Sequence, residues 1–501
     1  MGNVFGTPAG KKGGWLSPLV AILFFAFLWL LDFPKPFSDD LFYCGAGLNL
    51  ASGGDFANPL LARQHFPNHY FFVYPPIHSY AIAGWMKLFG ISARSLTGFQ
   101  DFMYALTALA TLAVLRRHQA PAWLEFFVPL GVAAAFLPIG LRPEPLSVAL
   151  AMTGFALIEC GARRRALIFP AFLLMFLGGA AAPRLTLFAG ALVLLAAGRL
   201  WQNSPAQGWR RWSFCFPCLG ALLLTGLIFL LFIGFRPAEF WQTFHLHSQR
   251  LNAGVFPLLH AYFFELISKT QWLLFFLPWP LLIIALGPPR KEIFYYGLFI
   301  AATFFPTALI GGIGHGTAWY AVLAAFFLAA SISRTAGRYQ AISFALFFLA
   351  MFLANAKNLV NAAGILSGAI QSGPGGQYAA ALRLRSTPEH PVLVDCAAAR
   401  YVYDYNLPRG CLDFGFSAPF PGIGVPDFFQ PQDVYVVSPA NIELLKRNTY
   451  LDFPPLPVWS PIGTPRWPFV SIVRWWLDQQ PCAAFVIPAE SCRGLRPDAH
   501  D

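Results

Sequence analysis

The chain has 501 residues, of which 57% are hydrophobic and only 11% are charged. Soluble globular proteins carry about 25% charged residues, so this composition excludes an ordinary soluble protein and predicts an integral membrane protein. The net charge of +11 does not indicate a nucleic-acid-binding surface, because the basic residues occur in short clusters between apolar runs and form no single patch.

The N-terminal segment carries Lys11 and Lys12 ahead of an apolar run at residues 15–31. This run is long for the hydrophobic region of a signal peptide, and no small-residue cleavage site follows it. We therefore predict an uncleaved first transmembrane helix.

Apolar runs of about 20 residues can cross a membrane as helices, and the sequence contains about eleven of them. They lie at residues 15–31, 97–115, 123–141, 146–162, 166–182, 185–198, 213–234, 271–287, 293–312, 317–333 and 339–355. If the N-terminus is cytoplasmic, alternation places every dense basic cluster on the cytoplasmic side, as the positive-inside rule requires. These clusters are Arg116-Arg117, Arg163-Arg164-Arg165, Arg199 with Arg210-Arg211, Arg290-Lys291, and Arg334 with Arg338. The predicted fold class is a polytopic α-helical membrane protein with its N-terminus inside and its C-terminus outside.

Residues 32–96 form a predicted external loop that contains an apolar stretch at residues 70–89. Pro75 and Pro76 prevent one helix from running through this stretch. Counting it as a span would also move the arginine clusters at 116 and 163 to the outside. We therefore predict an amphipathic or re-entrant segment at the external interface. A second external loop is predicted at about residues 235–270.

The composition changes from about residue 370. We divide the chain into a membrane domain at 1–360, a linker at 361–378 that contains Gly-Pro-Gly-Gly, and a small external α/β domain at 379–501. Short strand-like runs lie at 391–396, 433–438 and 483–488, and helix-like runs lie at 439–447 and 470–478.

Four of the eight cysteines fall in the predicted external domain, where oxidation allows three possible pairings. We favour two disulfides, Cys396–Cys411 and Cys482–Cys492. Cys215 and Cys218 have the spacing of a redox or zinc motif. They lie in an apolar helix without further ligands, which favours their role as small buried hydrophobes.

Two adjacent carboxylates, Asp39 and Asp40, follow the first helix at the point where the chain leaves the membrane. One interpretation is structural, with Ser38 or Asp39 capping a helix over residues 41–50. The functional interpretation is a general base, because a carboxylate beside a low-dielectric surface accepts a proton more readily. The two interpretations are compatible, and the pair is also a candidate ligand set for a divalent metal.

Further polar residues lie at predicted external helix ends. Arg142 and Glu144 occur in an Arg-Pro-Glu-Pro turn, Arg184 follows a proline, and His315 lies between two glycines. Each has a structural alternative: an ion pair that closes a helical hairpin, a snorkelling arginine, or a solvated histidine. Their convergence with Asp39 on one side favours a transferase, because a carboxylate base and a cationic phosphate clamp suit a phosphate leaving group.

These residues resemble motifs of the membrane-embedded glycosyltransferases of the C-type fold, which include lipid A aminoarabinose transferases and protein O-mannosyltransferases. The resemblance covers residues 15–355. Its motifs are Asp39-Asp40-Leu-Phe-Tyr43, then Tyr74-Pro75-Pro76 with a stretch that ends in Phe89-Gly90, then Arg142-Pro143-Glu144, and finally Arg184. Glu144 replaces the commoner Asp, and a segment with His315 and Tyr320 stands where the family often has Arg-Tyr.

The resemblance implies transfer of a hexosyl or pentosyl group from a polyprenyl-monophosphate donor to a glycan, lipid or protein hydroxyl, with inversion. In that mechanism Asp39 accepts the hydroxyl proton, and Arg184 and Arg142 stabilise the departing phosphate. Asp40 positions Asp39 or binds Mg or Mn. Candidate residues that orient the substrates are Glu144, His315, Tyr320 and Tyr74. The implied location is a bacterial inner membrane with a periplasmic active site.

Two other functions remain alternatives at this point. A glycan polymerase or ligase would act on a pyrophosphate-linked lipid. A transporter of lipid-linked sugars would place charges near the membrane midplane and show symmetry between two halves. The charges of this chain lie at helix ends, and its halves show no repeat.

Overall fold

The computed structural model describes residues 15–31, 38–58, 70–117, 122–136, 142–161, 164–203 and 212–249, and seven strands between residues 392 and 495. Within these ranges a few side chains lie outside the described part, among them those of Asp39, Asp40 and Arg184.

The N-terminal part of the chain is helical. The described helices are α1 (Leu16–Leu30), α2 (Ser38–Ala51), α3 (Pro76–Phe89), α4 (Ala93–Arg117), α5 (Ala122–Phe136), α6 (Pro143–Gly161), α7 (Ile168–Ala181), α8 (Thr186–Asn203), α9 (Cys215–Phe232) and α10 (Pro237–Gln249). Two 3-10 helices, η3 (Arg165–Leu167) and η4 (Pro183–Leu185), precede α7 and α8. By length and composition, the described segments Arg94–Arg117, Pro143–Gly161 and Trp212–Phe232 can each cross a membrane. The chain is an integral membrane protein.

Each apolar run predicted between residues 15 and 234 overlaps one of these helices. The predicted helix over 41–50 lies within α2, and the proline pair precedes the amphipathic segment as expected. Helix α3 begins at Pro76, where the fixed backbone angle of proline suits a first helical residue. The predicted runs from 271 to 355 lie outside the described residues, so the total of about eleven spans stays a prediction.

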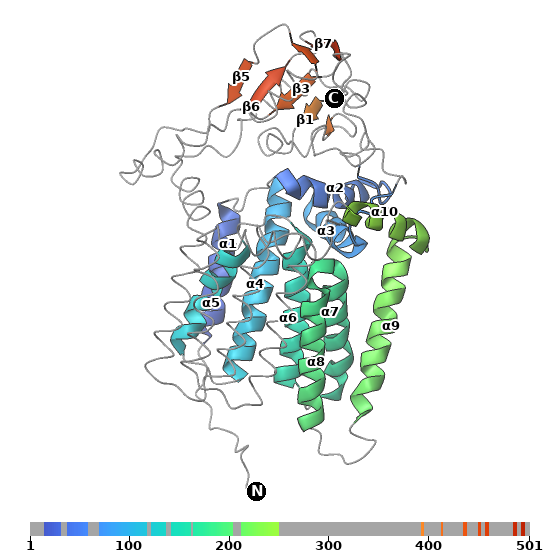
Figure 1. The fold of residues 1–501 in the computed structure, drawn as a ribbon. Helices are drawn as coiled ribbons and strands as arrows, with labels where there is room; N and C mark the ends of the chain where they lie inside the picture. The colour runs from blue at the N-terminus through green and yellow to red at the C-terminus, as the bar shows by residue number, and fades with distance from the viewer. Residues whose placement is uncertain are drawn as a thin grey trace, which may run out of the picture.

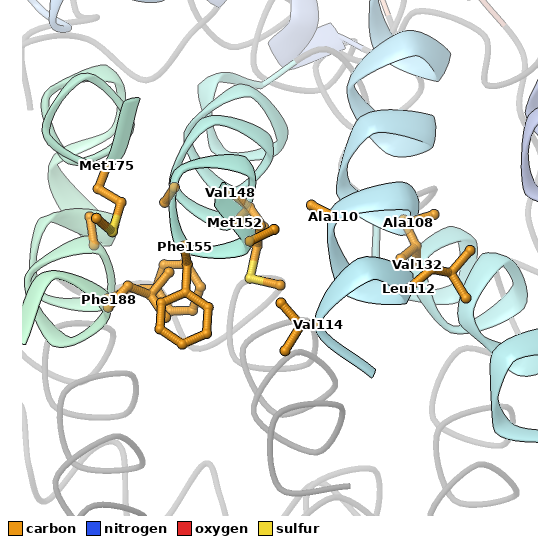
Figure 2. Packing of buried hydrophobic residues seen from close by; sticks show 14 of the residues in the cluster. Ala108, Ala110, Leu112, Val114, Val132, Val148, Met152, Phe155, Met175 and Phe188 are labelled. Atoms are coloured by element: carbon orange, nitrogen blue, oxygen red, sulfur yellow. The ribbon is translucent and has the colours of Figure 1, made fainter. Parts of the chain in front are cut away.

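The long helices form a bundle, and α2, α3 and α10 lie across one end of it (Figure 1). Buried side chains from α4, α6, α7 and α8 meet in one apolar cluster, which includes Met152, Phe155, Met175 and Phe188 (Figure 2). Small residues bring α6 and α7 close together. A Cβ atom on Gly178 would lie 2.6 Å from the backbone oxygen of Ser147, whose hydroxyl donates to the Gly178 carbonyl.

Basic residues gather at the other end of the bundle. Arg116 contacts Glu125 at 2.8 Å, and Ser17 also bonds that carboxylate, so one polar group ties α1, α4 and α5 together. The Arg199 guanidinium lies 3.3 Å from Glu159. This grouping agrees with the predicted clustering of arginines, while the assignment of this end to the cytoplasm stays a prediction.

The described strands near the C-terminus are β1 (Val392–Val394), β2 (Leu412–Asp413), β3 (Val434–Val437), β4 (Thr449–Leu451), β5 (Leu456–Trp459), β6 (Ala484–Ile487) and β7 (Cys492–Leu495). Five form a sheet in the order β2-β1-β3-β6-β5, and β4 pairs with β7. The strands β1, β2 and β3 are parallel, and β6 is antiparallel to both neighbours.

Three of these strands, β1, β3 and β6, fall on the strand-like runs of the sequence. The expected helices at 439–447 and 470–478 lie outside the described residues. The same is true of Cys396, Cys411, Cys482 and the side chain of Cys492, so both disulfides and the domain boundaries stay predictions.

Candidate functional site

Helix α2 carries the acidic pair at one end of the bundle. It begins at Ser38, so Asp39 and Asp40 lie in its first turn, where negative charge is favourable to a helix. Tyr43 follows Asp39 by four residues and therefore lies on the same side of the helix. The side chains of Asp39 and Asp40 are not described, but the backbone places both within one turn of Tyr43.

Two glycines allow α2 to pack closely against its surroundings. A Cβ atom on Gly47 would lie 2.8 Å from the backbone oxygen of Ser79 and 3.0 Å from the side chain of Ile82, so α3 approaches the α2 backbone directly. A Cβ atom on Gly45 would overlap the side chain of Asn58. A larger residue cannot occupy either position without movement. The Gly47 contact therefore limits how α2 lies on α3, and the Gly45 contact holds the turn after α2 against that helix.

The segment before α3 brings Tyr74 to the same place. The backbone N–H of Phe71 donates to the carbonyl of Phe56 at 2.8 Å, which joins the segment before α3 to the turn after α2. The Asn49 side chain donates to the backbone carbonyl of Asp55 at 3.0 Å and holds this turn against α2. Tyr74 therefore reaches α2 although it lies 31 residues beyond Tyr43.

A polar cluster of Tyr43, Tyr74 and Arg142 results, which we call the tyrosine–arginine cluster. The hydroxyl oxygens of the two tyrosines are 2.9 Å apart, and their rings meet edge to face with centroids separated by 4.6 Å. A guanidinium N–H of Arg142 donates to the Tyr43 hydroxyl at 3.2 Å, and the guanidinium carbon lies 5.1 Å from the Tyr43 ring centroid. Tyr43 is buried, whereas Tyr74 and Arg142 are half-buried. The cluster thus combines one fixed positive charge with two hydroxyl groups.

Glu144 lies two residues after Arg142, in the first turn of α6, and only 3% of it is exposed. Its Oε2 atom has no hydrogen-bond partner among the described residues. A buried carboxylate oxygen normally has a donor, so this atom is available to accept a further hydrogen bond. The ion pair between Arg142 and Glu144, which was the structural alternative for this turn, does not occur among the described ion pairs.

Aromatic contacts attach α10 to the α3 end of the bundle. The Tyr80 ring stacks on Phe232 with centroids 4.0 Å apart, and its hydroxyl donates to the Phe232 carbonyl at 3.2 Å. Beyond Phe232, the Arg236 guanidinium lies 4.5 Å from the centroid of the Tyr70 ring. Phe72, two residues after Tyr70, contacts Phe240 of α10. The segment that supplies Tyr74 is therefore supported on both sides.

His78 lies on α3, four residues after Tyr74, and is 3% exposed. It makes a hydrogen bond to the backbone of Tyr43, and its Nε2 atom has no partner among the described residues. Burial lowers the pKa of His78 to about 3, and the bond to Tyr43 opposes this shift only in part. The imidazole is therefore neutral at any physiological pH.

The buried neutral state of His78 predicts a loss of stability in acid. A histidine in the unfolded chain has a pKa of 6.5. Below that pH the unfolded state binds a proton that the folded state excludes, so stability falls as the pH decreases toward about 3. This loss of stability is complete below about pH 3 and is absent above about pH 6.5.

We expect the wild type to lose about 2 kcal/mol more than His78→Asn between about pH 6.5 and about pH 5, since each pH unit in this range corresponds to about 1.4 kcal/mol. Unfolding midpoints in nanodiscs at several pH values measure this difference. Parallel pH profiles for the two proteins would contradict it.

The structure joins some of the predicted site residues and leaves others untested. Arg142 and Tyr74 meet at Tyr43, and Glu144 lies beside Arg142 in sequence at the start of α6. Arg184 is in η4 with its side chain outside the described part, and His315 and Tyr320 lie outside the described residues.

Sequence reasoning assigned no role to Tyr43 or His78. Tyr43 was part of a motif, and its position four residues after Asp39 was the available signal. No sequence pattern distinguished His78 from an ordinary core histidine.

The described helices define a polytopic membrane protein that carries the tyrosine–arginine cluster at the end of its bundle formed by α2 and α3. No protein-family model matches the chain, and no curated protein matches its sequence.

The structure is similar to the crystal structure of ArnT from Cupriavidus metallidurans bound to undecaprenyl phosphate. The TM-score is 0.51 at 15% sequence identity, over 95% of this chain and 98% of that chain. It also matches the S. cerevisiae protein O-mannosyltransferase Pmt1-Pmt2 complex bound to the sugar donor, with a TM-score of 0.36 and 17% identity over 47% of this chain and 35% of that chain. The first likeness confirms the predicted resemblance at the level of the fold.

Proposed function

We propose that this protein is a membrane glycosyltransferase that moves a sugar from a polyprenyl-monophosphate donor to an acceptor hydroxyl. The observation that carries the proposal is the tyrosine–arginine cluster, whose Tyr43 lies one helical turn after Asp39, in a fold similar to that of ArnT. The ArnT structure contains undecaprenyl phosphate. An arginine with two hydroxyl groups beside it is suited to bind the phosphate of such a lipid.

The reaction uses each group of the site in a defined way. Asp39 accepts the proton of the acceptor hydroxyl, and the hydroxyl oxygen forms a bond to the anomeric carbon. The bond between that carbon and the phosphate oxygen breaks, and its electron pair stays on the polyprenyl phosphate. Attack opposite the leaving group inverts the anomeric centre. Arg142 and the tyrosine hydroxyls stabilise the charge that develops on the phosphate, which is a large term in transfers of this kind.

Other predicted residues fit around this centre. Arg184 is a second candidate for the donor phosphate, and Glu144 is available to accept hydrogen bonds from the sugar or the acceptor. Adjacent residues on a helix do not face each other, so Asp39 and Asp40 alone do not form a closed set of ligands for Mg or Mn. We therefore assign no reaction step to a metal and propose that Asp40 positions Asp39.

The end of the bundle that carries α2, α3 and α10 is the proposed external side. This assignment follows from the arginines at the opposite end, which the positive-inside rule places in the cytoplasm. In a bacterial inner membrane the transfer would then take place at the periplasmic surface. The acceptor would be a glycan, a lipid or a protein hydroxyl.

The full chain in nanodiscs tests this proposal. It should release polyprenyl phosphate from at least one member of a panel of polyprenyl-monophosphate sugars, and it should not act on the matching pyrophosphate-linked sugars. Turnover of pyrophosphate donors alone would indicate a polymerase or ligase instead. Movement of intact lipid-linked sugar between leaflets without turnover would indicate a transporter. Parallel assays with EDTA and with added Mg or Mn test the need for a metal.

A further inference from the structure

A buried histidine, His78, lies on α3 near the tyrosine–arginine cluster. His78 is 3% exposed and bonds to the backbone of Tyr43. Because its Nε2 atom has no partner among the described residues, the nitrogen that makes this bond is Nδ1. A backbone carbonyl is an acceptor, so Nδ1 carries the proton and donates it to the Tyr43 carbonyl.

This bond joins α2 to α3 beside the tyrosine–arginine cluster. Its acceptor is the backbone of the residue whose hydroxyl bonds Arg142 and Tyr74. The donor lies on α3, four residues after Tyr74. The bond therefore joins the same two segments that meet in the tyrosine–arginine cluster.

The contact at Gly47 also holds α2 against α3, close to the His78 bond. One helical turn after Tyr43, α2 lies so close to Ser79 that a Cβ atom on Gly47 would be 2.8 Å from the Ser79 oxygen. The His78 bond and this contact are adjacent along both helices. Close packing limits the distance between α2 and α3, and the hydrogen bond adds a direction that apolar packing does not provide.

Burying an apolar side chain at the position of His78 would cost less desolvation free energy than burying an imidazole. The apolar side chains that pack against α3 in its core cluster include Cys44 of α2 and Phe99 and Met103 of α4. Placing an imidazole among such residues costs free energy unless its polar atoms are satisfied. Only the Nδ1 side of His78 has a partner among the described residues, so packing alone does not account for a histidine here.

We propose that His78 is a positioning residue for the transfer reaction: its Nδ1–H bond to Tyr43 sets α2 on α3. The bond orients the Tyr43 hydroxyl toward Arg142 and Tyr74. It also sets the position of Asp39 and Asp40, which lie one turn earlier on the same helix. This inference rests on the proposed function, because it assigns His78 to the same site.

Two substitutions separate the hydrogen bond from simple packing. In His78→Asn the side-chain amide can place an N–H near the position of Nδ1, whereas His78→Leu fills the space without a donor. We expect His78→Asn to keep the single-turnover transfer rate within about threefold of the wild type, and His78→Leu to lose about 30-fold or more, because small misplacements of reacting groups have effects of this size. The unfolding midpoint at neutral pH should change little in either variant.

A second measurement reports the position of α2 without any need for activity. Cys44 follows Tyr43 on α2 and is fully buried against α3. Its rate of alkylation, read on the Cys44 peptide by mass spectrometry, should be low in the wild type and in His78→Asn. In His78→Leu it should rise about tenfold, since loosening of α2 exposes local sites before global unfolding.

The outcomes distinguish this inference from the proposed function. If no donor is turned over by the wild type, the proposed function fails, while the alkylation of Cys44 still shows whether His78 holds α2. If the wild type is active and His78→Leu matches it in both measurements, the positioning role is wrong. Equal losses in His78→Asn and His78→Leu would also overturn it, because the donor group would then make no difference.

Discussion

Asp39→Asn is expected to abolish sugar transfer, with a fall of about 1,000-fold or more in the single-turnover rate, because loss of a general base typically costs 100- to 10,000-fold. Asparagine keeps the size of aspartate and its place in the first turn of α2, but it cannot accept the acceptor's proton. Binding of undecaprenyl phosphate should therefore change little. Transfer is measured with purified protein in nanodiscs and the donor identified from the panel.

Two further variants serve as controls for this result. Glu239→Gln removes an exposed carboxylate on α10, which pairs with Arg236 at 3.5 Å, and should leave the rate unchanged. Asp40→Asn should have a smaller effect than Asp39→Asn, because in the proposed mechanism Asp39 accepts the proton and Asp40 only positions Asp39. An active Asp39→Asn with an inactive Asp40→Asn would move the base to Asp40. Activity in both would remove the pair from the mechanism.

Arg142→Gln should weaken the binding of undecaprenyl phosphate and lower transfer by about 100- to 1,000-fold, as expected for the loss of one preorganised group that stabilises developing charge. The variant removes the guanidinium that donates to the Tyr43 hydroxyl at 3.2 Å. Arg142→Lys should also be impaired, because a lysine ammonium cannot reproduce the planar fork of arginine. Equilibrium binding of the lipid and single-turnover rates measure the two effects separately.

Arg94 provides a matched control for this arginine. Its guanidinium carbon lies 4.9 Å from the centroid of the Trp29 ring, much as Arg142 lies over Tyr43, but Arg94 is exposed at the start of α4. Arg94→Gln should leave lipid binding and transfer within about twofold of the wild type, because exposed pairs contribute little. Unchanged lipid affinity in Arg142→Gln would exclude Arg142 from the phosphate site.

The helices of the described membrane part could be predicted because their signal is local. A long apolar run has to satisfy its backbone polar groups internally when it enters a membrane, and a helix achieves this within the run itself. The same applies to α3, whose start at Pro76 follows from the geometry of proline. The positions of the acidic pair and of the Arg-Pro-Glu turn at helix ends were likewise visible in the sequence.

The contacts between the residues of the site could not be predicted from the sequence. Tyr43 bonds Tyr74 and Arg142, which follow it by 31 and 99 residues, and neither separation corresponds to a local period. The structural alternative for the Arg-Pro-Glu turn, an ion pair of Arg142 with Glu144, is not found among the described ion pairs. Arg142 instead donates to a tyrosine from a distant segment.

The sequence by itself therefore determined the class of the protein, the helices of the described membrane part and the polar residues at their ends, because hydrophobic length and proline act locally. The tertiary structure alone decided that α2 crosses α3 at Gly47, that His78 bonds Tyr43, and that Tyr74 and Arg142 share one hydroxyl. Those features depend on the close approach of helices, which the summed packing of many distant side chains sets and no single stretch of sequence encodes.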